Sequence, residues 1–284
     1  MPANLGPRAM RIHHLNAATL HPVAAPQRAR PRRATMVTHC LLVELGSGLL
    51  LVDTGIGLLD VAVPLRRLGP EFLAWMAPDL VAAQTVVRQL EALGFDRSDV
   101  QQIALTHLDP DHAGGLADFP GAKVHVMARE YLAASSLYGR VVRRRYRPAQ
   151  WAHAPRFELH EPTGPAWFGF KATSALGGLP AEVRLVSLPG HSRGHAGIAI
   201  ELHGRWLLFT GDATLPHDEP GDNALLRSAS SRLAAWGAPG VRERDDTAAR
   251  LRALGRNQAG KIIMVSSHDP ADLERCRRQG ELSA

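Results

Sequence analysis

The chain has 284 residues and a mass of 30.7 kDa, enough to bury a substantial core in one large domain or two small ones. Its 45% hydrophobic and 21% charged residues are typical of a globular protein, and no stretch reaches the roughly 20 apolar residues of a membrane span. The segment from Met1 to Leu20 lacks the apolar core of a secretion signal, so we expect a cytoplasmic protein. Because its only cysteines, Cys40 and Cys276, lie far apart, any metal is expected to be held by histidines and carboxylates.

The formal net charge of +6 and the isoelectric point of about 10.0 permit contact with nucleic acids or anionic substrates. One cluster of arginines is dense and has tyrosines between its members: Arg140, Arg143, Arg144, Arg145 and Arg147, with Tyr138 and Tyr146. Runs of charge are usually solvated, so we interpret this cluster as a solvated helix face or loop. We therefore expect a small-molecule substrate as the partner, with neither nucleic acid nor a membrane, and a homodimer is compatible with the sequence.

Apolar periodicity predicts strands and helices in a mixed order. The first half is predicted to contain strands at 36–45 and 49–52 joined by a turn at 46–48, a helix at 79–93 that Asp79 caps and Gly94 ends, and a strand at 103–105. The second half is predicted to contain a strand at 123–127, a helix at 129–137, strands at 183–188 and 206–210, helices at 223–236 and 245–254, and a strand at 262–267. This mixture is typical of stacked α and β layers.

Residues 139–180 are the least regular part of the chain and are rich in proline, glycine and aromatic residues. We interpret them as an inserted segment that covers a pocket, within a single domain spanning residues 1–284. Aromatic residues in such a segment more often cover a core than bind a ligand, although a pocket wall needs the same residue types.

The run His107-Leu108-Asp109-Pro110-Asp111-His112 packs four potential metal ligands into six positions, directly after the strand predicted at 103–105. In extended chain, His107, Asp109 and Asp111 point the same way, and His112 can turn inward as the chain bends into a helix. One short loop can then serve two adjacent ions. The alternative is that Asp-Pro-Asp forms only a turn and a helix cap beside two incidental histidines.

Three later strands also run into candidate ligands. The strand at 183–188 precedes His191, the strand at 206–210 precedes Asp212, and the strand at 262–267 leads into His268. Loops at the ends of strands are where catalytic residues concentrate. Four apolar strands that each deliver histidine or aspartate at the carboxyl end therefore favour a metal site over incidental histidines.

With these motifs the chain resembles the metallo-β-lactamase superfamily, and the match runs from Met36 to His268 in the family's order of motifs. The resemblance implies an α/β fold, a four-layer αββα sandwich (α+β by some schemes) with one or two metal ions at the edge of its two sheets. It implies one ion held by His107, His191 and the residue at 109, a second held by Asp111, His112 and His268, and a bridge of Asp212 and a hydroxide. The catalytic roles would fall to Asp111 and Asp212.

The same resemblance assigns supporting roles outside the ligand set. Asp53, in an Asp-Thr-Gly turn, matches an aspartate that supports the ligand loop, and His195 resembles a histidine that orients ligands without binding metal. The candidate substrate-pocket residues are Tyr138, Trp151, His153 and His217.

The loop departs from the family pattern at its third position, where Asp109 replaces a histidine. Three carboxylates and a hydroxide would neutralise two divalent ions, so we expect a site that accepts iron or manganese as well as zinc. The competing interpretation is that Asp109 does not coordinate, which leaves one ion at Asp111, His112 and His268.

Two metal ions generate a nucleophile and polarise a carbonyl or phosphoryl oxygen, so hydrolysis is the expected chemistry. The chain looks most like the lactonase-type branch, which opens acyl-homoserine lactones and related esters. That branch has a tyrosine three residues after the bridging aspartate, where this chain has Leu215, so His217 or a tyrosine of the insert would have to protonate the leaving group. The alternatives are a phosphodiesterase or ribonuclease, a diiron redox protein, and a non-catalytic metal-binding protein.

Overall fold

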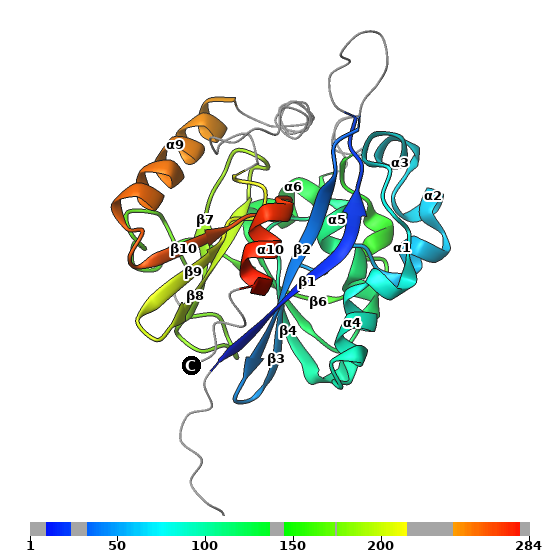
Figure 1. Ribbon diagram of the computed structural model, residues 1–284, viewed down its shortest axis with the longest axis horizontal. Coiled ribbons are helices and arrows are strands. Elements are labelled where there is room, and N and C mark those ends of the chain that lie inside the picture. Colours follow the sequence, from blue (N-terminus) through cyan, green and yellow to red (C-terminus); the bar gives the residue numbers. More distant parts are fainter. Residues whose placement is uncertain (1–9, 24–32, 137–144, 174, 215–240, 279–284) are drawn as a thin grey trace, which may run out of the picture.

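The structure is a computed structural model that describes residues 10–23, 33–136, 145–173, 175–214 and 241–278 (Figure 1). Its first sheet has six strands in the order of the chain: β1 (Arg11–Leu20), β2 (Met36–Leu45), β3 (Gly48–Val52), β4 (Val100–Ala104), β5 (Lys123–Met127) and β6 (Arg156–His160). Strands β1 to β3 are antiparallel, and β3 to β6 are parallel. The parallel part places the carboxyl ends of β3 and β4 at the same edge.

The second sheet has four strands in the order β10-β9-β8-β7: β7 (Val183–Ser187), β8 (Ala196–Leu202), β9 (Arg205–Phe209) and β10 (Ile262–Val265). Strands β9 and β10 are parallel, whereas β7, β8 and β9 are antiparallel. The two sheets pack face to face over a shared core that includes Leu41 and Leu50 from the first sheet and Leu185 and Ile198 from the second. This core joins the halves of the chain and brings their strand ends together.

Helices cover the outer faces of both sheets (Figure 1). The helices are α1 (Leu58–Ala62), α2 (Pro64–Arg67), α3 (Pro70–Met76), α4 (Val86–Ala92), α5 (Pro110–Ala113), α6 (Ala128–Ser135), α9 (Val241–Asn257) and α10 (Pro270–Arg278), with 3-10 turns at Ala82–Gln84, Arg97–Asp99, Gly114–Asp118 and Pro148–Gln150. Leu90 of α4 packs on the outer face of the first sheet, and Leu251 of α9 packs on that of the second. The result is the predicted α/β fold, a four-layer αββα sandwich.

Burial on both faces explains why the central strands are continuously apolar. Leu41 of β2 points into the core between the sheets, and its neighbour Leu42 points into the core beneath the helices. A strand that is covered on both faces needs apolar residues at every position. The sequence therefore predicted β2 and β3 and their hairpin correctly.

Other elements differ from the prediction. The helix predicted at 79–93 is a 3-10 turn followed by α4, and its cap is Thr85, whose extended backbone leaves its carbonyl free to accept from Arg88 and Gln89. The predicted cap at Asp79 was wrong, because its side chain pairs with His21 and its amide donates to Thr19.

Three strands were missed: β1, β8 and β6. Strand β6 lies within the insert and extends the first sheet beside β5. The insert therefore contributes to the sheet in addition to any role as a cover. The helix predicted at 223–236 lies outside the described residues. Within the ranges that the structure describes, no helix combines the length and the apolar character needed to cross a membrane.

Candidate metal centre

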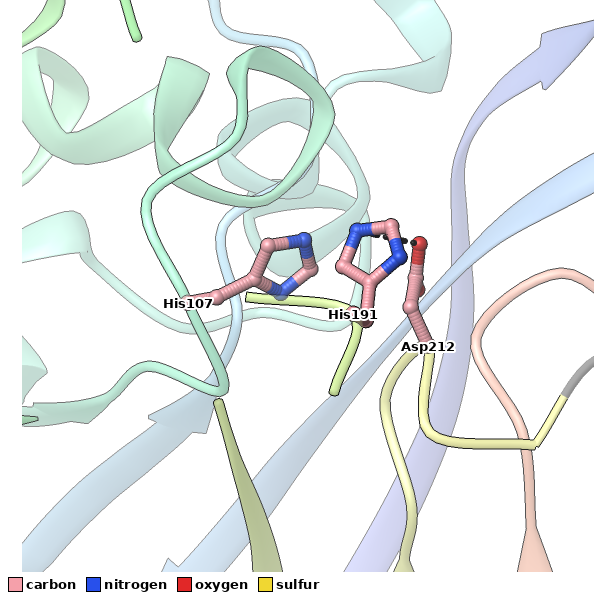
Figure 2. A group of neighbouring side chains, drawn as sticks. All are labelled: His107, His191 and Asp212. Atoms are coloured by element: carbon pink, nitrogen blue, oxygen red, sulfur yellow. Dashed lines mark ion pairs between the residues drawn. The ribbon is translucent and has the colours of Figure 1, made fainter. Parts of the chain in front are cut away.

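The candidate ligands gather at one edge of the sandwich, where four strands end. His107 follows β4, His191 follows β7, Asp212 follows β9 and His268 follows β10. Figure 2 shows three of them, His107, His191 and Asp212, pointing toward one another from separate segments. The arrangement follows from the topology, because the pairing of the two sheets brings these strand ends together.

Six of the predicted ligands form two groups. In the first, donor atoms of His107, His191 and Asp212 lie within 4.8 Å of one another. The other three residues form the second group, whose members are all buried: Asp111, His112 and His268. No third group of this kind occurs among the residues that the structure describes.

Asp212 lies between the two groups. Its Oδ2 is 3.4 Å from His191 Nε2 and 3.2 Å from His268 Nε2, and its Oδ1 is 3.3 Å from His112 Nε2. With metal–nitrogen distances of about 2.0–2.1 Å, the ligands of a tetrahedral ion lie about 3.3 Å apart. The spacing around Asp212 therefore fits a carboxylate that contacts two ions.

Two buried donor atoms of these ligand groups have no hydrogen-bond partner in the described part of the chain. They are His112 Nε2 and Asp212 Oδ1, which face one another at 3.3 Å. Buried polar atoms are rarely left unsatisfied, since each costs about 1–3 kcal/mol. A histidine nitrogen and a carboxylate oxygen converging in this way fit a divalent metal ion, whose ligands would be these atoms.

Asp53 orients the ring of His112. Its Oδ2 accepts from His112 Nδ1 at 2.8 Å and from the Thr106 hydroxyl at 2.7 Å, and its Oδ1 accepts from the Thr106 amide at 2.7 Å. Because the proton of the ring is held at Nδ1, Nε2 is free to bind metal. Asp53 thus lies where a supporting residue is expected, and it fixes both the start of the loop and one of its ligands.

His268 and His195 are also held by specific hydrogen bonds. His268 Nδ1 donates to the Val37 carbonyl at 2.8 Å, which leaves Nε2 directed at Asp212. His195 Nε2 accepts from the Asp212 amide at 3.0 Å, so its proton is on Nδ1. Gly211, at φ 56°, passes so close that a Cβ would lie 2.7 Å from His195 Nε2. His195 therefore positions the backbone of Asp212 and does not belong to either ligand group.

The electrostatics of the centre favour a bound cation. Burial lowers the pKa of His112, but the carboxylates of Asp212, Asp111 and Asp53 outweigh it and hold that pKa well above its usual value. Burial likewise opposes protonation of His268, yet Asp212 and Asp111 raise its pKa to about 9. Burial alone would raise the pKa of Asp212, but the neighbouring histidines, above all His268, hold it well below its usual value. The raised pKa values of His112 and His268 show that the surrounding carboxylates favour positive charge at this centre.

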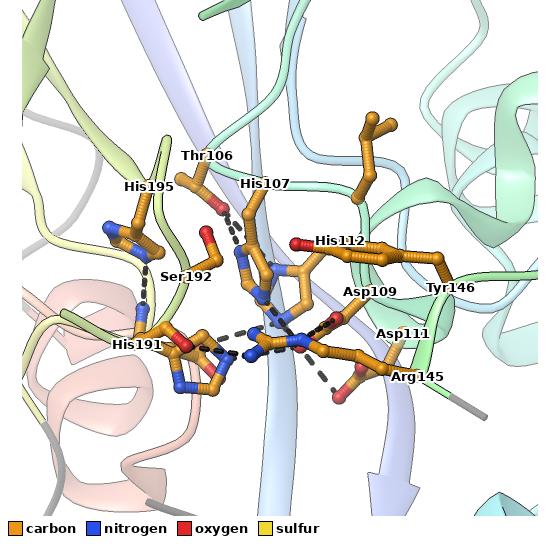
Figure 3. Close-up of polar contacts among 12 residues, drawn as sticks. Thr106, His107, Asp109, Asp111, His112, Arg145, Tyr146, His191, Ser192 and His195 are labelled. Carbon is orange, nitrogen blue, oxygen red and sulfur yellow. Dashed lines mark hydrogen bonds and ion pairs between the residues drawn. The ribbon is translucent and has the colours of Figure 1, made fainter. Parts of the chain in front are cut away.

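Asp109 is held differently from the other predicted ligands (Figure 3). Its carboxylate accepts two hydrogen bonds from Arg145, from Nε at 2.6 Å and from Nη2 at 2.8 Å. Its Oδ2 is also 3.1 Å from His107 Nε2 and 3.0 Å from His191 Nε2. Burial opposes ionisation, but Arg145 and His107 hold the pKa of Asp109 well below its usual value.

Two members of the basic cluster are buried, so its interpretation as a solvated surface was wrong for them. Arg145 is 4% exposed and Tyr146 is 5% exposed. The Tyr146 hydroxyl donates to Glu130 at 3.0 Å, and burial together with the negative charge of Glu130 raises its pKa. Tyr146 therefore has no free hydroxyl to offer a substrate.

Glu130 of α6 was missed by the sequence analysis. Its buried carboxylate accepts from the Leu108 amide at 3.1 Å, the Ser192 hydroxyl at 2.6 Å and the Gly194 amide at 3.2 Å, in addition to Tyr146. It thereby ties the two ligand-bearing loops to one helix. A single glutamate early in a helix carries no sequence signal for this role, because its partners come from three other segments.

The predicted pocket residues fall into two sets. Trp151 is half-buried and packs on the core beneath the helices, and His153 is exposed. Tyr138 and His217 lie outside the described residues, as does Leu215. The assignment of these four residues to a pocket stays a prediction.

Comparisons with known proteins give matches over most of the chain. Residues 34–260 match the Metallo-beta-lactamase superfamily. Over 265 residues the chain is 38% identical to the "Probable metallo-hydrolase" of Mycobacterium tuberculosis (strain H37Rv), which covers 92% of this chain and 81% of the relative. It is 29% identical over 241 residues to the N-acyl homoserine lactonase AiiA of Bacillus thuringiensis subsp. kurstaki, covering 84% and 83% of the two chains.

The fold is also similar to that of solved structures. One is an N-acyl homoserine lactone hydrolase with the product N-hexanoyl-L-homoserine at its catalytic metal centre, with a TM-score of 0.69 and 22% identity. The similarity covers 95% of this chain and 97% of the other. At this level of identity the comparison shows a shared fold.

Proposed function

The chain belongs to the metallo-β-lactamase superfamily and is a metallo-hydrolase of that family, and we propose that it opens a lactone or cleaves a related ester of a small molecule. The observation that carries this proposal is the pair of buried ligand groups with Asp212 between them. The relatives named as N-acyl homoserine lactonases support the choice of an ester-type substrate.

The donor set fits two divalent ions, and zinc suits its histidine and carboxylate ligands. When bound, two such ions polarise a carbonyl or phosphoryl oxygen and lower the pKa of water. His107 and His191 would hold one ion, the second group would hold the other, and Asp212 would contact both. Asp53 and His195 keep these ligands oriented, so little reorganisation is needed during the reaction.

Lactone opening requires a proton for the departing alkoxide oxygen. Tyr146 does not supply it, because its hydroxyl is buried and donates to Glu130. We propose that the donor comes from the segment after Asp212, where His217 remains the sequence-based candidate.

A panel of acyl-homoserine lactones, aryl esters, thioesters and phosphodiesters tests this function on zinc-loaded protein. We expect lactones to be opened with the highest kcat/KM. His112→Ala should lower that value by more than about 100-fold, since even residues behind a metal ligand contribute about 10- to 100-fold. The matched control is His203→Ala on an exposed turn, which should retain activity.

The outcome that contradicts the proposal is a folded, zinc-loaded protein that cleaves phosphodiesters but no lactone or ester. That result would favour the phosphodiesterase alternative. Loss of folding rather than activity in His112→Ala would favour a structural role for the metal.

A further inference from the structure

The pairing of Asp109 with Arg145 has the geometry of a permanent ion pair. Two parallel hydrogen bonds join the planar guanidinium to the carboxylate, at 2.6 Å and 2.8 Å. The third nitrogen, Nη1, donates to the His191 carbonyl at 2.7 Å. Such forked contacts are strong and fix orientation as well as charge.

One oxygen of this pair stands at a ligand position. Asp109 Oδ2 lies 3.1 Å from His107 Nε2 and 3.0 Å from His191 Nε2, close to the spacing expected between ligands of one ion. In the family pattern described above, this third loop position is a histidine, which is a neutral ligand. A lone carboxylate there would add a negative charge to the buried site.

We propose that Asp109 and Arg145 act as one electrically neutral ligand unit, in which Asp109 offers the oxygen to the first ion and Arg145 cancels its charge and fixes its direction. The inference rests on the two-ion centre of the proposed function. Arg145 is a positioning residue in this unit, since it reaches the ion only through Asp109.

The unit changes the expected metal preference. Asp111 and Asp212 are then the ligand carboxylates that pair with histidines and with no arginine among the described residues, as in a site with histidine at position 109. The extra anionic character that favours manganese or iron is removed. We therefore infer a zinc centre, in place of the mixed preference expected from the three carboxylates alone.

The backbone beside Arg145 is anchored independently of the metal. Tyr146 donates to Glu130, which also accepts from the Leu108 amide, one residue before Asp109. The residues next to the two partners of the ion pair are thus held by the same buried carboxylate. This arrangement keeps the guanidinium over Asp109 without help from the substrate.

A competing explanation is that Arg145 only ties its segment to the loop of His191 through the carbonyl contact. The two explanations differ in how substitutions combine. If Arg145 only holds the backbone, replacing it should weaken zinc binding equally whether position 109 is aspartate or histidine. If Arg145 neutralises Asp109, its presence should weaken zinc binding once Asp109 is replaced by a neutral histidine, because the guanidinium is then an unpaired buried charge.

The experiment compares Arg145→Met, Asp109→His and the double variant with the wild type. Zinc per chain is counted by elemental analysis after loading and desalting, and zinc affinity is measured by competition with a chromogenic chelator. Arg147→Met is the matched control, because Arg147 lies two positions away and donates to the Arg66 carbonyl at 3.2 Å.

We expect Asp109→His alone to bind zinc at least about tenfold more weakly than the wild type, the scale of effect seen when groups behind a ligand are disturbed. Adding Arg145→Met should restore the affinity to within about threefold, with two zinc ions per chain. If Asp109→His fails to fold, a folded double variant with two zinc ions supports the unit.

Three results would overturn the neutral ligand unit: full zinc affinity in Asp109→His, a double variant that binds zinc more weakly than Asp109→His, or a double variant that does not fold. Lactone hydrolysis is measured on the same preparations. An inactive wild type with two zinc ions refutes the proposed function, whereas additive effects in an active wild type refute only the neutral unit.

Discussion

Asp53 adopts a left-handed backbone conformation, with φ 54°, at the point where β3 ends. Non-glycine residues in this region cost free energy and persist where the surroundings hold them. Here the turn directs the carboxylate back toward Thr106 and His112, both of which donate to it. The strain is therefore located at a residue that belongs to neither ligand group but orients the ring of His112.

Asp53→Asn should weaken metal binding by about 10- to 100-fold at the ion that His112 would hold. The amide is neutral and has one accepting oxygen, whereas both oxygens of the Asp53 carboxylate accept hydrogen bonds from Thr106 and His112. Competition with a zinc chelator measures this change. Asp79→Asn is the control, since Asp79 also pairs with a histidine, His21, but at the surface. Unchanged affinity for both ions in Asp53→Asn would refute the supporting role.

At the scale of elements, α6 acts as the support on which two loops of the centre rest. The loop after β7 approaches so closely that a Cβ on Gly194 would lie 2.1 Å from the amide nitrogen of Glu130. The loop after β4 is held through the Leu108 amide. A short helix outside both sheets thus determines the distance between His107 and His191.

Glu130→Gln should lower the free energy of unfolding of the metal-free protein by about 3 kcal/mol, because an amide cannot accept all the hydrogen bonds that the carboxylate accepts. Denaturant unfolding measures this. Glu158→Gln is the matched control: Glu158 makes an exposed pair with Lys123 at 3.8 Å, so its substitution should change the value by less than about 1 kcal/mol. Equal effects of the two substitutions would contradict the role of Glu130.

At the scale of the whole molecule, two pairs of buried or half-buried histidines lie outside the metal centre. His14 Nδ1 is 2.8 Å from His39 Nε2, and His125 Nδ1 is 2.8 Å from His160 Nε2. Burial, followed by nearby positive charge, lowers the pKa of His14 and of His125 to about 4. These pairs make the fold sensitive to acid in a way that does not depend on metal.

The lowered pKa values determine whether stability rises or falls with pH. Between about pH 6.5 and 4 the unfolded chain binds protons at His14 and His125 that the folded chain does not, so stability is lost as the pH falls through this window. We expect about 1–2 kcal/mol per histidine. The double variant His14→Asn and His125→Gln should lose less stability than the wild type when thermal unfolding is followed in EDTA from pH 7.5 to 4.5.

The wild type and the double variant must be compared because His112 and His268 have raised pKa values. When metal is absent, these two histidines stabilise the fold as the pH falls, which is the opposite effect. The exposed His203→Gln serves as the control and should follow the wild type. Identical losses in the wild type and the double variant would contradict the prediction.

Much of the fold was predictable because its signals are local. The apolar runs of β2 and β3 and the ligands directly after β4, β7, β9 and β10 are readable from adjacent residues, and the resemblance they support is confirmed. Strand β1 was missed because its polar residues, such as His13 and Asn16, find partners on β2 and beyond. Strand β6 was missed because its residues are largely exposed at the edge of the sheet.

The sequence by itself determined the family, the layered fold and the set of side chains available for metal, since each depends on residue type and short spacing. The tertiary structure alone decided which of these side chains meet and what charge they carry. Asp109 is the example: its partner Arg145 lies 36 positions further along the chain, in a cluster whose composition indicated a solvated surface. Charge compensation in a buried site acts through space, so only the folded chain shows that this carboxylate is paired.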